Sequence, residues 1–210
     1  MKRVKSARII LNEPSLGPCT LDGRFVRLEP LRANQAAALW EVARGMDWGS
    51  MLGPLRSREE VDQRITDRLS AEDRKAEYAF AVFLKLKNRI VGSTSYLEVA
   101  PKREIAEIGS TWYSPDVQGT VVNPECKYLL LKHAFEDWGA IRVQLGTDVK
   151  NIHSQRAILK LGAKFEGRLR NHGIRPDGSI RDSMLYSIIS QEWPGVKKAL
   201  EARIESFARS

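Results

Sequence analysis

The chain has 210 residues, with 34 Lys and Arg against 26 Asp and Glu, which gives a formal net charge of +8 and a sequence pI near 9.6. Hydrophobic content of 42% is ordinary for a globular protein, and no apolar run approaches the roughly 20 residues of a membrane span. The basic residues are spread along the chain, which argues against specific nucleic-acid binding but leaves a general attraction to acidic partners.

The amino end is basic, but its apolar stretch is too short for a signal peptide, so we expect a cytoplasmic protein. Residues 1–20 contain a turn-rich connector and are interpreted as an appended arm, with residues 21–210 forming one domain. Cys19 and Cys126 lie far apart and are expected to be free thiols. None of the three histidines has neighbours spaced as metal ligands, so no metal is expected.

The apolar patterns predict about seven strands, at residues 24–31, 78–85, 89–99, 104–113, 141–147, 164–170 and 181–189. Helices are predicted at residues 34–44, from 57 to about 70, from 123 to about 139, from 152 to 161 and from 193 onward. Ser57 and Glu60 have the spacing of a capping box at the start of the second helix.

The last helix carries a stripe of large apolar residues. This stripe consists of Trp193, Val196, Leu200, Ile204 and Phe207. We expect it to pack against the chain's own sheet, and the alternative is a contact between subunits.

The stretch from Tyr113 to Lys127 leads from an apolar strand through a loop into a helix. Asn123 suits the N-cap, Pro124 the first helical position and Glu125 the first turn. Free backbone N–H groups and the positive end of the helix dipole make such a helix start a natural site for an anion. We therefore expect a phosphate to bind here.

Later segments extend this pattern. Asn151 and Ser154 stand at a helix start, Leu161-Gly162-Ala163 at a helix stop, and residues 175–182 form a turn before the last strand. Together with the loop at Gln118, and in this order, these pieces resemble the GNAT superfamily of acyl-CoA N-acyltransferases over residues 20–195. The likeness is closest to the branch of ribosomal-protein N-terminal (alanine or serine) acetyltransferases.

The resemblance implies an α/β (α+β) GNAT fold. This fold has a mixed central sheet of about seven strands, helices on both faces, and a splay between strands four and five, here residues 104–113 and 141–147. It implies an acetyl-CoA-dependent N-acetyltransferase that acts by direct transfer on a primary amine. The acceptor is either a protein amino terminus, such as that of a ribosomal protein, or a small amine, and members of this branch often form homodimers. The alternative is a non-catalytic acyl-CoA-binding regulatory module.

The resemblance also implies the residues that contact the cofactor. They are Gln118, Gly119, Thr120, Val121, Val122, Asn123, Asn151, Ser154 and Arg156. The usual loop pattern is Gln/Arg-x-x-Gly-x-Gly/Ala, and here Val121 and Asn123 stand at the two small-residue positions, which alters the grip on the pyrophosphate. As purely structural devices, Asn151 would cap its helix and Ser154 would complete the first turn.

Acylation of an amine needs a base, and Glu107 is the best candidate. It stands between Ala106 and Ile108 in an apolar strand, where burial raises a carboxyl pKa toward the useful range. The alternative is a strand glutamate paired with an arginine. Glu98 and Glu104 are poorer candidates because they lie at strand edges.

The acid that protonates the leaving thiolate is less clearly marked. Related acetyltransferases often use a tyrosine just after the Leu-Gly-x turn, and this chain has none there. His172 is the natural substitute, because an imidazole can donate a proton near neutral pH. Tyr186 on the last strand is the other possibility. A loop histidine held by nearby charge, or a tyrosine in the core, is the structural alternative for each.

Overall fold

The computed structural model describes residues 16–46, 48, 54–74 and 76–209. The interpretation of residues 1–15 as part of an arm lies outside the described residues. Leu16 is buried in the main core, and Cys19 lies beside His133, so the chain packs onto the domain from the first described residue onward.

The predicted mixed sheet is confirmed, with eight strands among the described residues. They are β1 (Leu21–Asp22), β2 (Val26–Pro30), β3 (Tyr78–Leu84), β4 (Arg89–Ala100), β5 (Ile105–Tyr113), β6 (Arg142–Asp148), β7 (Lys164–Ile174) and β8 (Ile180–Ile189). Their order across the sheet is β1-β2-β3-β4-β5-β6-β8-β7, and β5 and β6 are parallel while the other neighbours are antiparallel. The strand added to the prediction is the two-residue β1.

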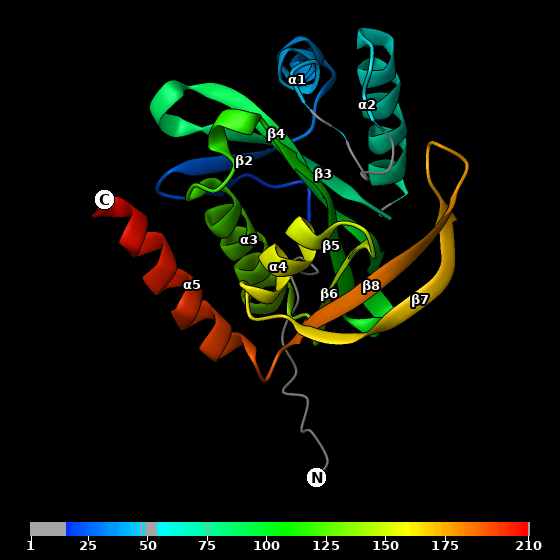
Figure 1. Ribbon diagram of the computed structural model, residues 1–210. Helices are drawn as coiled ribbons and strands as arrows, with labels where there is room; N and C mark the ends of the chain where they lie inside the picture. The colour runs from blue at the N-terminus through cyan, green and yellow to red at the C-terminus, as the bar shows by residue number, and fades with distance from the viewer. Residues whose placement is uncertain (1–15, 47, 49–53, 75, 210) are drawn as a thin grey trace.

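Helices cover both faces of the sheet (Figure 1). They are α1 (Ala36–Ala43), α2 (Arg58–Asp73), α3 (Val122–Lys132), α4 (Ile152–Leu159) and α5 (Trp193–Ala208). Residues of α1 and α2 form one apolar cluster with β3, and residues of α3, α4 and α5 form the larger cluster on the opposite face. No helix in the described part of the chain is long and apolar enough to span a membrane.

Local chemistry explains where α2 begins and where α3 ends. The Ser57 hydroxyl accepts a hydrogen bond from the Glu60 N–H at 3.2 Å, as the sequence predicts, while the Glu60 carboxylate binds the N–H of Arg56. Helix α3 continues into a π-helical turn, His133–Trp138, and stops at Gly139, whose φ of 83° few other residues adopt readily.

The first three residues of the apolar stripe of α5 pack inside the molecule, as predicted, while Ile204 and Phe207 are half-buried. Trp193, Val196 and Leu200 are buried in the larger core, and the Trp193 ring stacks on Phe135 at 5.4 Å between centroids. The Trp193 indole N–H donates to Glu136. Helix α5 is therefore an integral part of the domain.

We predict that Leu200→Asp destabilises the fold by about 3–5 kcal/mol or more, since Leu200 is 1% exposed and a buried charge adds to the lost packing. Urea unfolding followed by circular dichroism measures the change. Ala202→Asp is the matched control, because this residue is exposed on the same helix. A folded, equally stable Leu200→Asp protein would show that the stripe does not support the core.

Candidate active site

The two parallel strands part in the middle of the sheet. Pairing between β5 and β6 runs from Ile105↔Arg142 to Glu107↔Gln144 and goes no further, although β5 continues to Tyr113 and β6 to Asp148. Beyond this point β6 stays paired with β8. The predicted splay is therefore present. Because β5 and β6 are parallel, α3 and α4, which follow them, begin at the same open end.

A β-bulge in β5 accompanies the parting. Ser95 pairs with Gly109 and Ser93 with Trp112, so β5 carries an extra residue opposite β4. Ser110, inside this bulge, has a φ of 47°. A bulge bends its strand and increases the local twist, and we attribute the divergence of β5 from β6 to it.

The loop from Gln118 to Val121 presents free backbone donors at the open end. Gly119 has a φ of 75°, and the Gln118 side chain donates to the Tyr113 carbonyl at 3.2 Å. Within the described part of the chain, the N–H groups of Gly119, Val121 and Asn123 donate no hydrogen bond. Val121 has an ordinary right-handed helical conformation, which any residue adopts without strain, so this position does not require a glycine.

The predicted start of α3 is wrong by two residues. Val121, not Asn123, is the N-cap residue, and its side chain makes no capping hydrogen bond. The Thr120 hydroxyl, one residue earlier, accepts from the Val122 N–H at 3.3 Å. Pro124 therefore lies at the third position, where its missing N–H is still not needed. The Asn123 side chain accepts instead from the Tyr113 hydroxyl at 3.3 Å.

Two charged residues of α3 turn inward. The buried Glu125 carboxylate accepts from the N–H groups of Arg24, Phe25 and Val26 at 2.7–2.8 Å and ties α3 to the first strands. The buried Lys127 ammonium donates to Thr111 at 2.5 Å, and burial lowers its pKa to about 8.

The Cys126 thiol is also buried, which raises its pKa to about 12 and makes it a packing residue.

Helix α4 begins as predicted. The Asn151 side chain accepts from the Ser154 N–H at 2.9 Å, so this asparagine is the N-cap. Ser154 is half-buried and Arg156 is exposed on the same helix. Gly162, with a φ of 94°, follows α4, and a Cβ at this position would lie 3.0 Å from the Val196 side chain.

Glu107 occupies the fork where the strands part. Its carboxylate accepts from the Gln144 side chain at 2.8 Å and lies over two glycines, such that a Cβ on Gly109 or Gly146 would be 3.3 Å from its Oε1. Burial raises the pKa of this carboxyl, and the charge of Glu98 adds to the effect. The Gln144 hydrogen bond and the charges of His172 and Arg181 partly offset it.

The structure places His172, but not Tyr186, on the side of Glu107. His172 lies in β7 and not in a loop, because β7 passes a bulge at Asn171 and resumes pairing at Gly173. Its ring is exposed, and its Nδ1 lies 3.0 Å from the Ser183 hydroxyl. Tyr186 is 2% exposed and belongs to the core on the opposite face of the sheet.

A buried ion pair fixes the hairpin that carries His172. The Arg175 guanidinium donates to Asp148 at 2.7 and 2.9 Å, and Asp148 also accepts from the backbone N–H of Lys150. These bonds keep the pKa of the Asp148 carboxyl low. Arg181 lies beside the same carboxylate at 3.5 Å.

Sequence reasoning does not select Gln144 or Arg181, which lie beside Glu107, or Arg68, which lines a pocket on the side of α2. Gln144 alternates with apolar residues in its strand, which is only a weak signal for a residue facing a cleft, and Arg181 is followed by the polar residues Asp182 and Ser183. Arg68 stands in a highly charged helix, where nothing local separates it from its neighbours.

Comparisons with known proteins agree with this arrangement. Residues 26–164 match a family model described as an acetyltransferase (GNAT) domain. A solved protein from T. thermophilus, provisionally assigned as an acetyltransferase, is 36% identical, with a TM-score of 0.77 over 89% of this chain and 97% of that one.

Two further proteins are named for ribosomal acceptors. YdaF of Bacillus subtilis (strain 168), provisionally assigned as a ribosomal N-acetyltransferase, is 31% identical over 93 residues, 44% of this chain and 49% of that protein. The ribosomal L7/L12 alpha-N-protein acetyltransferase RimL, solved with coenzyme A, is 18% identical, with a TM-score of 0.69 over 81% of this chain and 97% of that one. The second likeness shows the fold alone.

The raised pKa of Glu107 predicts a pH-dependent stability effect. The folded state favours the protonated carboxyl of Glu107. Ionisation of this group therefore lowers the stability of the fold as the pH rises above about 4.3, the ordinary pKa of a glutamate in an unfolded chain. We expect Glu107→Gln to be as stable as the wild type at pH 4 and more stable at pH 8 in thermal unfolding. Glu104→Gln, at an exposed position, is the control. A variant that loses stability at pH 8 would contradict the assignment.

Proposed function

The chain belongs to the acetyltransferase (GNAT) family and is an N-acetyltransferase, and on this premise we propose that it transfers an acetyl group from acetyl-CoA directly to the α-amine of a protein amino terminus. The observation that carries the proposal is the position of Glu107. This carboxylate with a raised pKa stands where β5 and β6 part, at the open end of the sheet.

The loop and the parted strands fit the donor. Acetyl-CoA supplies the acetyl group as an activated thioester. The N–H groups of Gly119, Val121 and Asn123 would bind its pyrophosphate, supported by Gln118, Thr120 and Val122. The backbone edge of β5 beyond Glu107, which β6 leaves unpaired, would hold the pantetheine arm. Asn151, Ser154 and Arg156 of α4 complete the site at the same open end.

Glu107 removes a proton from the acceptor ammonium, directly or through a water molecule. An α-amine has an ordinary pKa of about 7.7–8.0 against about 10.4 for lysine, so a carboxylate of raised pKa suits a protein amino terminus better than a lysine side chain. His172 delivers the proton to the thiolate that leaves. We favour it over Tyr186, whose ring is buried on the other face.

The choice of a protein amino terminus over a small amine draws on the name of YdaF and on this match of pKa values. A panel of synthetic peptides, free amino acids and small amines tests it. Acetyl transfer is followed by release of free thiol and by product mass. Selective acetylation of small amines would overturn the acceptor assignment. Binding of acetyl-CoA without any thiol release would favour a non-catalytic binding module.

Cofactor binding is predicted to depend on charge at the start of α3. Asn123→Asp keeps the side-chain shape but adds a negative charge beside the proposed pyrophosphate site. We expect the thermal stabilisation by saturating acetyl-CoA to fall by several degrees. Asn34→Asp, an exposed change next to α1, should leave the stabilisation unchanged. An equal shift in both variants would remove this loop from the site.

Turnover is predicted to depend on Glu107. Glu107→Gln keeps a group that can accept the Gln144 hydrogen bond but cannot take a proton. We expect kcat to fall about 10²-fold or more, with the stabilisation by acetyl-CoA near normal. The acidic limb of the pH–rate profile should also be lost. Full activity of this variant would move the base to Glu98 or Glu104.

A further inference from the structure

A pocket opens on the face of the sheet that carries Glu107. It lies between α1, α2 and strands β3 to β5, and its polar wall includes Arg64, Arg68, Ser95 and Ser110. Ser110 belongs to the bulge of β5, three residues along the strand from Glu107. The pocket and the proposed base thus share one strand and one face.

Arg68 occupies the inner wall of this pocket. Its guanidinium donates to the Ser110 hydroxyl at 2.8 Å and to the Ser95 hydroxyl at 3.4 Å, and it pairs with Glu77. Its side chain is only 15% exposed. Burial, together with the charge of Arg64, lowers the Arg68 pKa to about 10. Glu77 already pairs with Arg68, and an anion between the two guanidinium groups would also offset the repulsion between Arg64 and Arg68.

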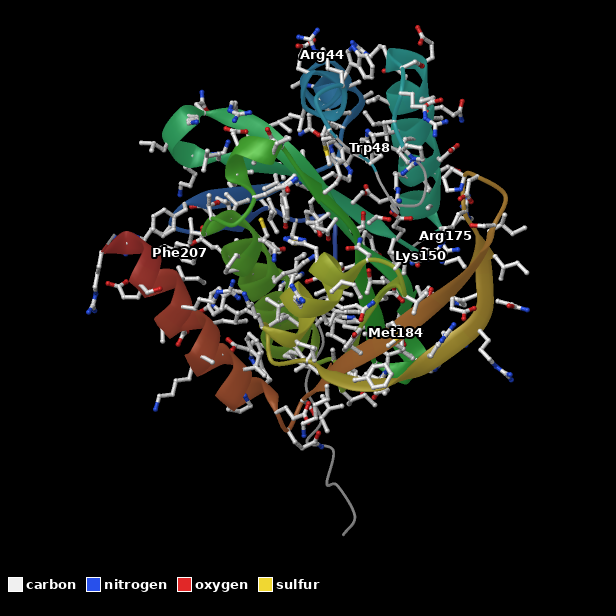
Figure 2. All side chains as sticks on the ribbon, in the orientation of Figure 1. Arg44, Trp48, Lys150, Arg175, Met184 and Phe207 are labelled. Carbon is white, nitrogen blue, oxygen red and sulfur yellow. The ribbon has the colours of Figure 1, made fainter. Side chains whose placement is uncertain are left out.

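The rest of the pocket wall is mainly apolar, so a ligand would meet polar groups on one side and apolar side chains on the other. Trp112 lines it, and the Trp48 ring packs against Trp112 at 5.5 Å between centroids. Figure 2 shows Trp48 on the side of α1 that faces α2. Leu39 and Ile65 form part of the apolar side. Planar guanidinium groups beside hydroxyls suit a carboxylate.

The spacing matches the start of a peptide. Three residues of a strand span roughly 10 Å, which limits the path along β5 from Glu107 to Ser110. An amine at Glu107 and a carboxylate at Arg68 would therefore be separated by about one extended residue and an acidic side chain. The net charge of +8 adds a long-range attraction for acidic acceptors.

We propose that this pocket binds a carboxylate of the acceptor, and that Arg64 and Arg68 make the enzyme prefer amines with an acidic side chain in the first two residues. The inference rests on the proposed function and adds a substrate class to it. It assigns Arg64 and Arg68 to specificity and leaves the proton transfers to Glu107 and His172.

The test uses peptide pairs that differ only by Glu or Gln at the first or second position. We expect the wild type to show kcat/KM about tenfold or more higher for the acidic member, the scale of one charge-assisted hydrogen bond. Arg64→Gln and Arg68→Gln should bring this ratio to within about twofold of unity through a higher KM, with the stabilisation by acetyl-CoA retained. Arg64→Gln covers the case in which the half-buried Arg68 cannot be replaced without unfolding.

Arg58→Gln is the matched control. Arg58 lies on the same helix but binds Asp62 outside the pocket, so its variant should keep the wild-type ratio. Free glutamate and glutamine form a second arm, and a preference for free glutamate over the peptides would support the pocket while assigning it a small acidic amine. Equal rates within each pair overturn the inference but leave the proposed function intact. Absence of acetylation of every amine, without stabilisation by acetyl-CoA, refutes both.

Discussion

The loss of pairing between β5 and β6 after Glu107 and Gln144 is the constraint on which the rest of the site depends. Parallel strands that stayed paired would satisfy each other's backbone groups and leave no edge for a ligand. The bulge at Ser110 bends β5, while β6 remains paired with β8 to Asp148. One inserted residue thus creates an open edge and places a half-buried carboxylate at its origin.

On each face of the sheet, a cationic side chain binds hydroxyl groups of β4 and β5 near this opening. On the face of α3, the buried Lys127 is held by the hydroxyls of Thr94 and Thr111, and the latter belongs to β5 just after the bulge. On the other face, Arg68 is held by Ser110 and Ser95. Each face thus binds the bulged region through a cation and two hydroxyls, with Lys127 buried and Arg68 half-buried, and this holds an irregular strand in one conformation.

Much of the fold follows from local patterns, and the differences have physical causes. The capping serine of α2 and the asparagine cap of α4 depend on contacts within four residues, and local patterns predict both. The sequence prediction misplaces the start of α3, because the Asn123 side chain accepts from the Tyr113 hydroxyl, ten residues away, and does not cap the helix. Glu107 stands out as a charge between apolar neighbours. Gln144 and Arg68 reach the site only through strand pairing and helix packing, which no local pattern encodes.

Charge acts at two ranges in this molecule, and the ranges have different consequences. The excess of basic residues attracts acidic partners from beyond contact distance. Salt at physiological ionic strength largely screens this attraction between charges that are more than about 8–10 Å apart. A guanidinium with a side chain 15% exposed is screened far less and acts only on a group that enters its pocket. The rate at which acidic acceptors reach the protein therefore depends on its net charge, whereas the choice among acceptors depends on the arginines of the pocket. A preference for acidic acceptors that arises from the pocket should persist at high salt, whereas one that arises from net charge should fade.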